Sequence, residues 1–245
     1  MPQRERRQLA LFIPLALVAA GLAAGTAQVL VFRELLVACQ GNEISMALML
    51  AAWLLWGALG AWWAGARRPA VSIGRACSKL AHLAAWPALS LLLAIATVRL
   101  FGPLLTYVTP PLAQPPGGVA SGLLNLFTLV PGEMLSVPQI ILLAFLGTML
   151  PALLAGAQFA AGCRAYLSLR PQSSETVGRA YALDAVGHLL GGTLLAWLAL
   201  QYVAPVLMAL LVGFANLALG LLIGAVAVRA AAARRLPQRA RLLLL

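Results

Sequence analysis

Charge is scarce in this chain, and negative charge is the scarcest. Charged residues make up 9% of the 245 residues, with six Asp or Glu against seventeen Lys or Arg, whereas soluble domains are about 25% charged. Hydrophobic residues make up 62% of the chain. This composition excludes an ordinary soluble domain and predicts an integral membrane protein whose first partner is the lipid bilayer.

Residues that hold common cofactors are also few. The three cysteines, Cys39, Cys77 and Cys163, lie far apart without CxxC or CxxCH spacing, which argues against a disulfide framework and attached haem. The two histidines, His82 and His188, offer two axial ligands in principle, but no further histidines accompany them. No glycine-rich nucleotide-binding motif occurs. We therefore expect no cofactor, no metal site and no catalytic residue in this chain.

Basic residues are present in four clusters that alternate with long apolar runs. Lys and Arg next to a span stay on the cytoplasmic side during insertion, so all four clusters are expected inside and the number of spans is expected to be even. The net charge of +11 lies in these loops and in the tail, where insertion and anionic lipid explain it, so nucleic acid is not an expected partner. The clusters are Arg4, Arg6 and Arg7; Arg67, Arg68, Arg75 and Lys79; Arg164, Arg170 and Arg179; and Arg229, Arg234, Arg235, Arg239 and Arg241.

Apolar runs of bilayer length predict an all-α polytopic bundle of about six transmembrane helices with both termini in the cytoplasm. Residues 1–8 are the expected cytoplasmic N-terminus and 229–245 a basic cytoplasmic tail. Between them, 9–228 is the bundle, with a Pro- and Gly-rich periplasmic loop at 108–136. The bacterial inner membrane is the expected location. The predicted spans are 9–37, 45–66, 80–107, 137–162, 180–201 and 205–228.

Small residues spaced four apart recur within these spans. Helices in lipid associate through close backbone approach, so such steps mark packed faces. They predict packing within the bundle, with homodimerisation as the alternative. The steps are Gly21 with Gly25, Gly57 with Ala61 and Gly65, Gly187 with Gly191, and Gly220 with Gly224.

Ionisable residues inside spans are costly and are therefore candidate functional residues. Arg33, Glu34 and Arg99 lie toward the outer ends of the first and third spans. Adjacent residues on a helix point about 100° apart, so we expect Arg33 to pair with Glu43 or Glu133, and Arg99 to pair with Glu34. These pairs either lock the outer half of the bundle or line a polar cavity that opens to the outside.

Asp184 and His188 form a second candidate group, one helical turn apart in the fifth predicted span. They share a face with Gly187 and Gly191, so the carboxylate can raise the imidazole pKa or hold its tautomer. A proton relay or ligand role is one interpretation. The other is helix packing, with Asp184 held by Arg164 or Arg179.

Five segments carry a resemblance to a known family. The chain resembles the membrane domain of bacterial membrane-fused spermidine synthases, the polyamine aminopropyltransferases. In that family a cytoplasmic Rossmann-like domain follows the membrane domain and transfers an aminopropyl group from decarboxylated S-adenosylmethionine to a polyamine. Residues 229–245 hold no counterpart of that domain, so no catalytic residue is carried over. The segments are 27–37 (AQVLVFRELLV), 41–43 (GNE), 51–60 (AAWLLWGALG), 150–157 (LPALLAGA) and 178–192 (GRAYALDAVGHLLGG).

These observations predict a non-catalytic inner-membrane protein that serves as the anchor or partner of a cytoplasmic enzyme, or that forms a homodimer. One alternative is a small transporter for a polyamine or another metabolite. The other is an accessory subunit of a membrane electron-transfer complex.

Overall fold

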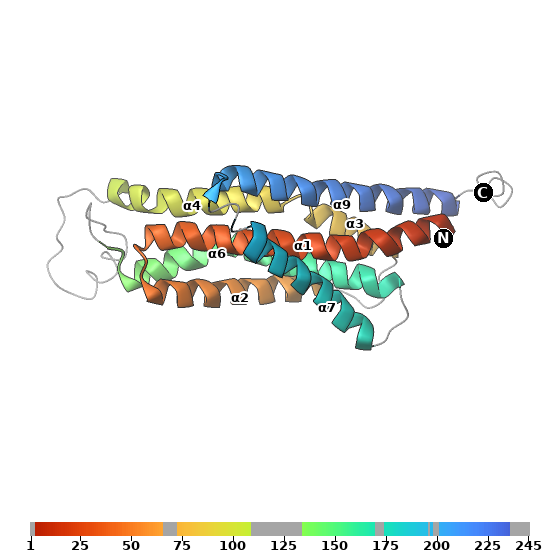
Figure 1. The fold of residues 1–245 in the computed structure, drawn as a ribbon, viewed down its shortest axis with the longest axis horizontal. Coiled ribbons are helices and arrows are strands. Elements are labelled where there is room, and N and C mark those ends of the chain that lie inside the picture. The colour runs from red at the N-terminus through yellow and green to blue at the C-terminus, as the bar shows by residue number, and fades with distance from the viewer. Residues whose placement is uncertain are drawn as a thin grey trace.

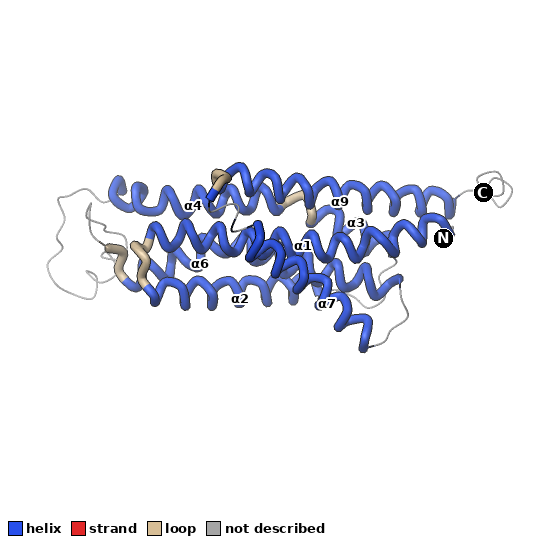
Figure 2. The backbone as a smooth tube through the Cα atoms, in the orientation of Figure 1, coloured by secondary structure: helices blue, strands red, loops and turns tan. Residues whose placement is uncertain are grey.

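The computed structural model describes residues 3–65, 73–108, 134–169, 174–195, 197 and 201–235. Within these ranges the chain forms helices and short turns and no strand (Figure 2), which confirms the all-α class. The helices are α1 (Gln3–Ala38), α2 (Glu43–Gly65), α3 (Ile73–Leu83), α4 (Pro87–Val108), α6 (Val137–Leu169), α7 (Ser174–Leu189), the π-helical η1 (Leu190–Leu195) and α9 (Pro205–Arg235).

Within the described ranges five segments are long and apolar enough to cross a membrane, so the chain is a multi-pass membrane protein. α7 and η1 occupy the fifth predicted span as far as Leu195. Most of the predicted periplasmic loop and the end of the basic tail lie outside the described residues. The five segments are Arg6–Ala38, Glu43–Gly65, Ile73–Leu104, Val137–Leu169 and Pro205–Arg229.

The third span differs from its prediction because it is broken. α3 ends at Leu83, residues 84–86 form a turn, and α4 begins at Pro87. Proline has no backbone N–H and disfavours helix in the residue before it, yet it suits the first position of a new helix. The new helix is stabilised by Ser90, whose backbone N–H donates to the Trp86 carbonyl over 2.9 Å.

The long helices lie side by side, with α1 central (Figure 1). α1 contacts α4, α6, α7 and α9, and α2 packs along α6. α7 crosses α1 obliquely, and α9 begins partway along α1 (Figure 1). The start of α1 and the end of α9 lie at one end of the bundle (Figure 1).

The two ends of the bundle differ in charge. We call one the basic end, because Arg6, Arg7 and Arg229 lie near the start of α1 and the end of α9. The other, which we call the outer end, holds the turn between α1 and α2 and the last turns of α4 (Figure 1). At the basic end an Arg6 Nη2 group donates to the Leu169 carbonyl over 3.5 Å. This contact ties α1 to the C-terminus of α6, where a cation also suits the helix dipole.

Glycines bring α1 and α7 into backbone contact. A Cβ built on Gly25 would lie 2.6 Å from the His188 carbonyl oxygen, and one built on Gly191 would collide with the Leu22 carbonyl. Thr26 adds a hydrogen bond from its Oγ1 to the Gly191 carbonyl at 3.3 Å. The predicted use of these small-residue steps in packing within the bundle is confirmed for this helix pair.

α2 and α6 approach each other in the same way. A Cβ on Gly60 would collide with the Leu153 backbone, and one on Gly156 would collide with the Gly57 carbonyl. Gly65, by contrast, has no neighbour among the described residues within 4 Å of such a Cβ. The predicted small-residue face on the second span therefore includes Gly60 and stops before Gly65.

Candidate functional site

Glu34 and Arg99 form an ion pair between α1 and α4 near the outer end, as the sequence predicts. Arg99 Nε donates to Glu34 Oε2 over 2.7 Å, and Arg99 Nη2 donates to Glu34 Oε1 over 2.9 Å. Two parallel bonds from one guanidinium are the strongest arrangement of such a pair. The Glu34 side chain is 10% exposed and that of Arg99 is 51% exposed, so the carboxylate is the buried member.

For Arg33 the structure tests one of the two predicted partners, Glu43. Glu43 lies exposed in the first turn of α2, where a carboxylate is stabilised by the helix dipole, and no ion pair joins it to Arg33. Glu133 is outside the described residues. The Arg33 Nη1 atom is buried and has no hydrogen-bond partner among the residues that the structure describes. Arg33 therefore brings into the bundle a positive charge that no described carboxylate offsets.

Asp184 and His188 lie together on α7 as predicted. The distance from His188 Nδ1 to Asp184 Oδ2 is 3.5 Å, which is long for a hydrogen bond. Arg179, one of the two partners considered for Asp184, instead pairs with Glu175 in its own helix. Because the backbone of Asp184 lies directly against Gly21 of α1, this pair is part of a close helix contact.

A buried amide pair between α6 and α9 was missed in the sequence. Gln158 Nε2 donates to Asn216 Oδ1 over 3.1 Å, and Asn216 Nδ2 donates back to Gln158 Oε1 over 3.5 Å. Both residues are 3% exposed. The available signal was a Gln in the middle of one apolar span and a lone Asn in another, because such side chains bond across helices in lipid.

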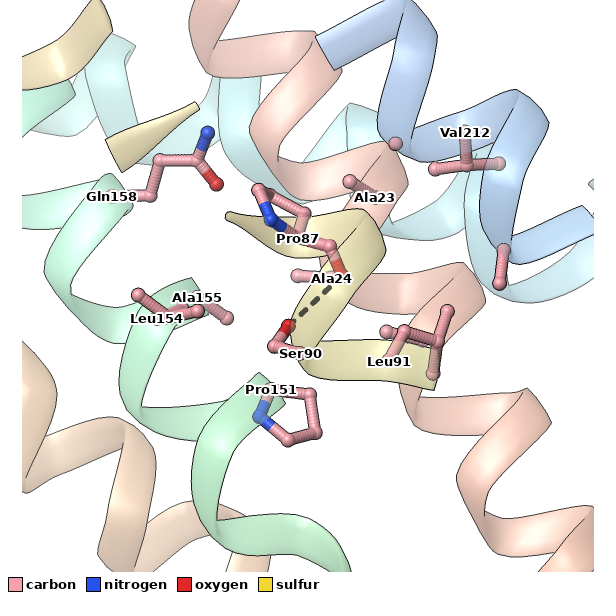
Figure 3. Close-up of a pocket in the computed structure, with 13 residues that line it drawn as sticks. Ala23, Ala24, Pro87, Ser90, Leu91, Pro151, Leu154, Ala155, Gln158 and Val212 are labelled. Carbon is pink, nitrogen blue, oxygen red and sulfur yellow. Dashed lines mark hydrogen bonds between the residues drawn. The ribbon is translucent and has the colours of Figure 1, made fainter. Parts of the chain in front are cut away.

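A small cavity lies beside this amide pair, in the middle of the bundle. It measures about 20 Å³ and is lined by α1, α4, α6 and α9. Figure 3 shows Gln158 on α6, and Ser90 on α4 with its hydroxyl donating to the Pro87 carbonyl. A volume of about 10–15 Å³ holds one water, so this cavity is too small for a substrate.

The amide pair leads to a stability prediction. Asn216→Leu leaves the Gln158 amide buried without its partner, so we expect a loss of about 1–2 kcal/mol in the free energy of unfolding. Unfolding of the purified protein in detergent measures this loss. The double variant Gln158→Leu with Asn216→Leu should recover most of it, and Ala215→Leu on the exposed side of α9 should have little effect. A double variant less stable than Asn216→Leu alone would contradict this account.

The polar groups belong to separate helix contacts. Glu34 and Arg99 are near the outer end, Gln158 and Asn216 satisfy each other in the middle, and Asp184 lies at the contact of α7 with α1. Across the described ranges, no group of three His, Cys, Asp or Glu side chains is placed to hold a metal ion.

Comparison of this chain with protein-family models, with curated proteins and with solved structures finds no match.

Proposed function

We propose that this protein is a non-catalytic inner-membrane protein that anchors or assists a cytoplasmic enzyme. The observation that carries the proposal is the closed middle of the bundle. Glycine contacts bring α1 against α7 and α2 against α6 at backbone distance, and the cavity between the central helices measures about 20 Å³. Substrate pockets usually measure about 300–1,000 Å³.

The basic end supplies a surface for the partner. Arg7 and Arg229 are exposed there, and the positive-inside rule predicts that this end faces the cytoplasm. A cationic surface at the membrane favours association with an acidic protein surface. The resemblance to the membrane domain of spermidine synthases suggests the partner's class, an aminopropyltransferase.

Two measurements test the proposal against transport. The protein reconstituted in vesicles should take up no more spermidine than protein-free vesicles, and purified alone it should transfer no aminopropyl group. The tagged protein, isolated in mild detergent, should co-purify an aminopropyltransferase. Arg7→Gln with Arg229→Gln should lower the recovered enzyme by about three- to tenfold, because each exposed ion pair contributes up to about 1 kcal/mol.

Glu43→Gln provides the control, since Glu43 is exposed at the outer end and should not change recovery of the enzyme. Protein-dependent uptake of spermidine would overturn the proposal in favour of a transporter. Recovery of enzyme that is unaffected by the two arginine substitutions would exclude the basic end as the docking surface.

A further inference from the structure

A cavity of about 300 Å³ lies near the outer end, between α1, α4 and the start of α6. Its volume is at the lower limit of the usual range for small-molecule sites. Apolar side chains form most of its wall, among them Val98, Phe101 and Leu143. Glu34 and Arg99 are its charged lining residues within the described part of the chain. The cavity is thus an apolar space with one ion pair in its wall.

The free hydrogen-bonding groups of this ion pair are donors. A guanidinium has five N–H groups, and Arg99 uses one on Nε and one on Nη2 for Glu34. No described residue accepts a bond from the other three. Both oxygens of Glu34 already accept a bond from Arg99, and its side chain is 10% exposed against 51% for Arg99. The three remaining N–H groups of Arg99 can therefore donate to a ligand, which favours a ligand with oxygen acceptors.

The balance of charge also favours an anion. The neighbouring Arg33 is not neutralised by any described carboxylate, and its Nη1 is buried without a partner. Arg33, Glu34 and Arg99 together leave one positive charge within the outer part of the bundle. A charge without a counter-charge in low dielectric is costly, so the excess among the described residues favours a nearby anion. A polycation such as spermidine would be repelled.

We propose that this cavity binds an anionic amphiphile, a single apolar chain that ends in a carboxylate or a phosphate monoester. The head group oxygens accept hydrogen bonds from the N–H groups of Arg99 that Glu34 does not use. Arginine is well suited to such bidentate binding of an oxyanion. The chain lies along Val98, Phe101 and Leu143. The volume equals roughly ten waters of liquid, enough for a head group and the beginning of one chain. Such a ligand can come from a membrane lipid or from a free fatty acid.

Photocrosslinking tests the proposal on the full chain in nanodiscs of phosphatidylcholine. The probe is a medium-chain fatty acid that carries a diazirine on its chain, and its matched control is the corresponding alcohol. We expect the acid to label peptides from the end of α1 and from α4 about tenfold more than the alcohol, because bonds to charged groups add this much to affinity. Equal labelling by acid and alcohol would overturn the proposal.

Two matched variants locate the site. Val37 lines the cavity and is 74% exposed, whereas Leu100 is 62% exposed and is not part of the lining. Val37→Trp narrows the cavity without disturbing the core, so labelling by the acid should fall to the level of the alcohol. Leu100→Trp should leave labelling unchanged. Labelling that survives Val37→Trp, or that is lost equally in both variants, would contradict the assignment.

Competition identifies the source of the ligand. Lysophosphatidic acid, a lipid with one chain and a phosphate monoester, should displace the probe if the site takes a membrane lipid, and unlabelled fatty acid alone should displace it if the site takes a free acid. Both results support an anionic amphiphile. Displacement by inorganic phosphate as effective as that by the fatty acid would show that the chain is not recognised and would overturn the proposal.

Discussion

Gly191→Leu is expected to destabilise the bundle by at least about 3 kcal/mol, the upper end of the usual cost of overpacking. A Cβ at this position collides with the backbone of Leu22, which cannot move unless α1 and η1 separate. Thr26 would then lose its hydrogen bond to the Gly191 carbonyl. The free energy of unfolding, measured by denaturant titration in detergent, reports this loss directly.

The neighbouring glycine is the matched control. Gly192 has no described neighbour within 4 Å of a Cβ, so the free energy of unfolding of the Gly192→Leu variant should lie within about 0.5 kcal/mol of that of the unmodified protein. Both variants add a leucine side chain to the same part of η1. They differ because residue 191 faces α1 and residue 192 does not. Equal stability of the two variants would show that α1 and η1 do not pack at backbone distance.

Arg99→Ala is expected to cost about 3 kcal/mol of folding free energy. The substitution removes both hydrogen bonds of Glu34 and leaves its buried carboxylate without a described counter-charge. Breaking one member of a buried pair costs about 3–5 kcal/mol, and the partial exposure of Arg99 places the effect at the lower end. Denaturant unfolding in detergent again provides the measurement.

Two comparisons separate this effect from a general loss of charge. The double variant Glu34→Gln with Arg99→Gln removes both charges together and should be more stable than Arg99→Ala. Arg75→Ala, at an exposed position on α3, should change stability by less than about 0.5 kcal/mol. An Arg99→Ala protein as stable as Arg75→Ala would contradict a structural role for the ion pair.

Part of the candidate site could be predicted from the positions of charged residues within the predicted spans. Glu34 and Arg99 were paired from their depth within two spans, because an ion inside a membrane needs a counter-ion at the same level. For Arg33 the same reasoning left two partners: Glu43 is excluded, since it lies exposed in the first turn of the next helix, and Glu133 lies outside the described residues. Gln158 and Asn216 lie 58 residues apart, and periodicity within one helix cannot bring two such side chains together.

The sequence by itself determined that the chain is helical and enters the membrane, because apolar runs of bilayer length must satisfy their backbone hydrogen bonds internally. It also determined the packed glycine face between α1 and α7, because close approach in lipid requires small side chains, whereas the contacts of Gly60 and Gly156 came only from the structure. Only the tertiary structure decided that α7 crosses α1 obliquely and that α9 begins partway along it (Figure 1). It also decided that a cavity opens beside Arg99. These features depend on how the surfaces of several helices fit together, and the spacing of residues along one helix does not contain that information.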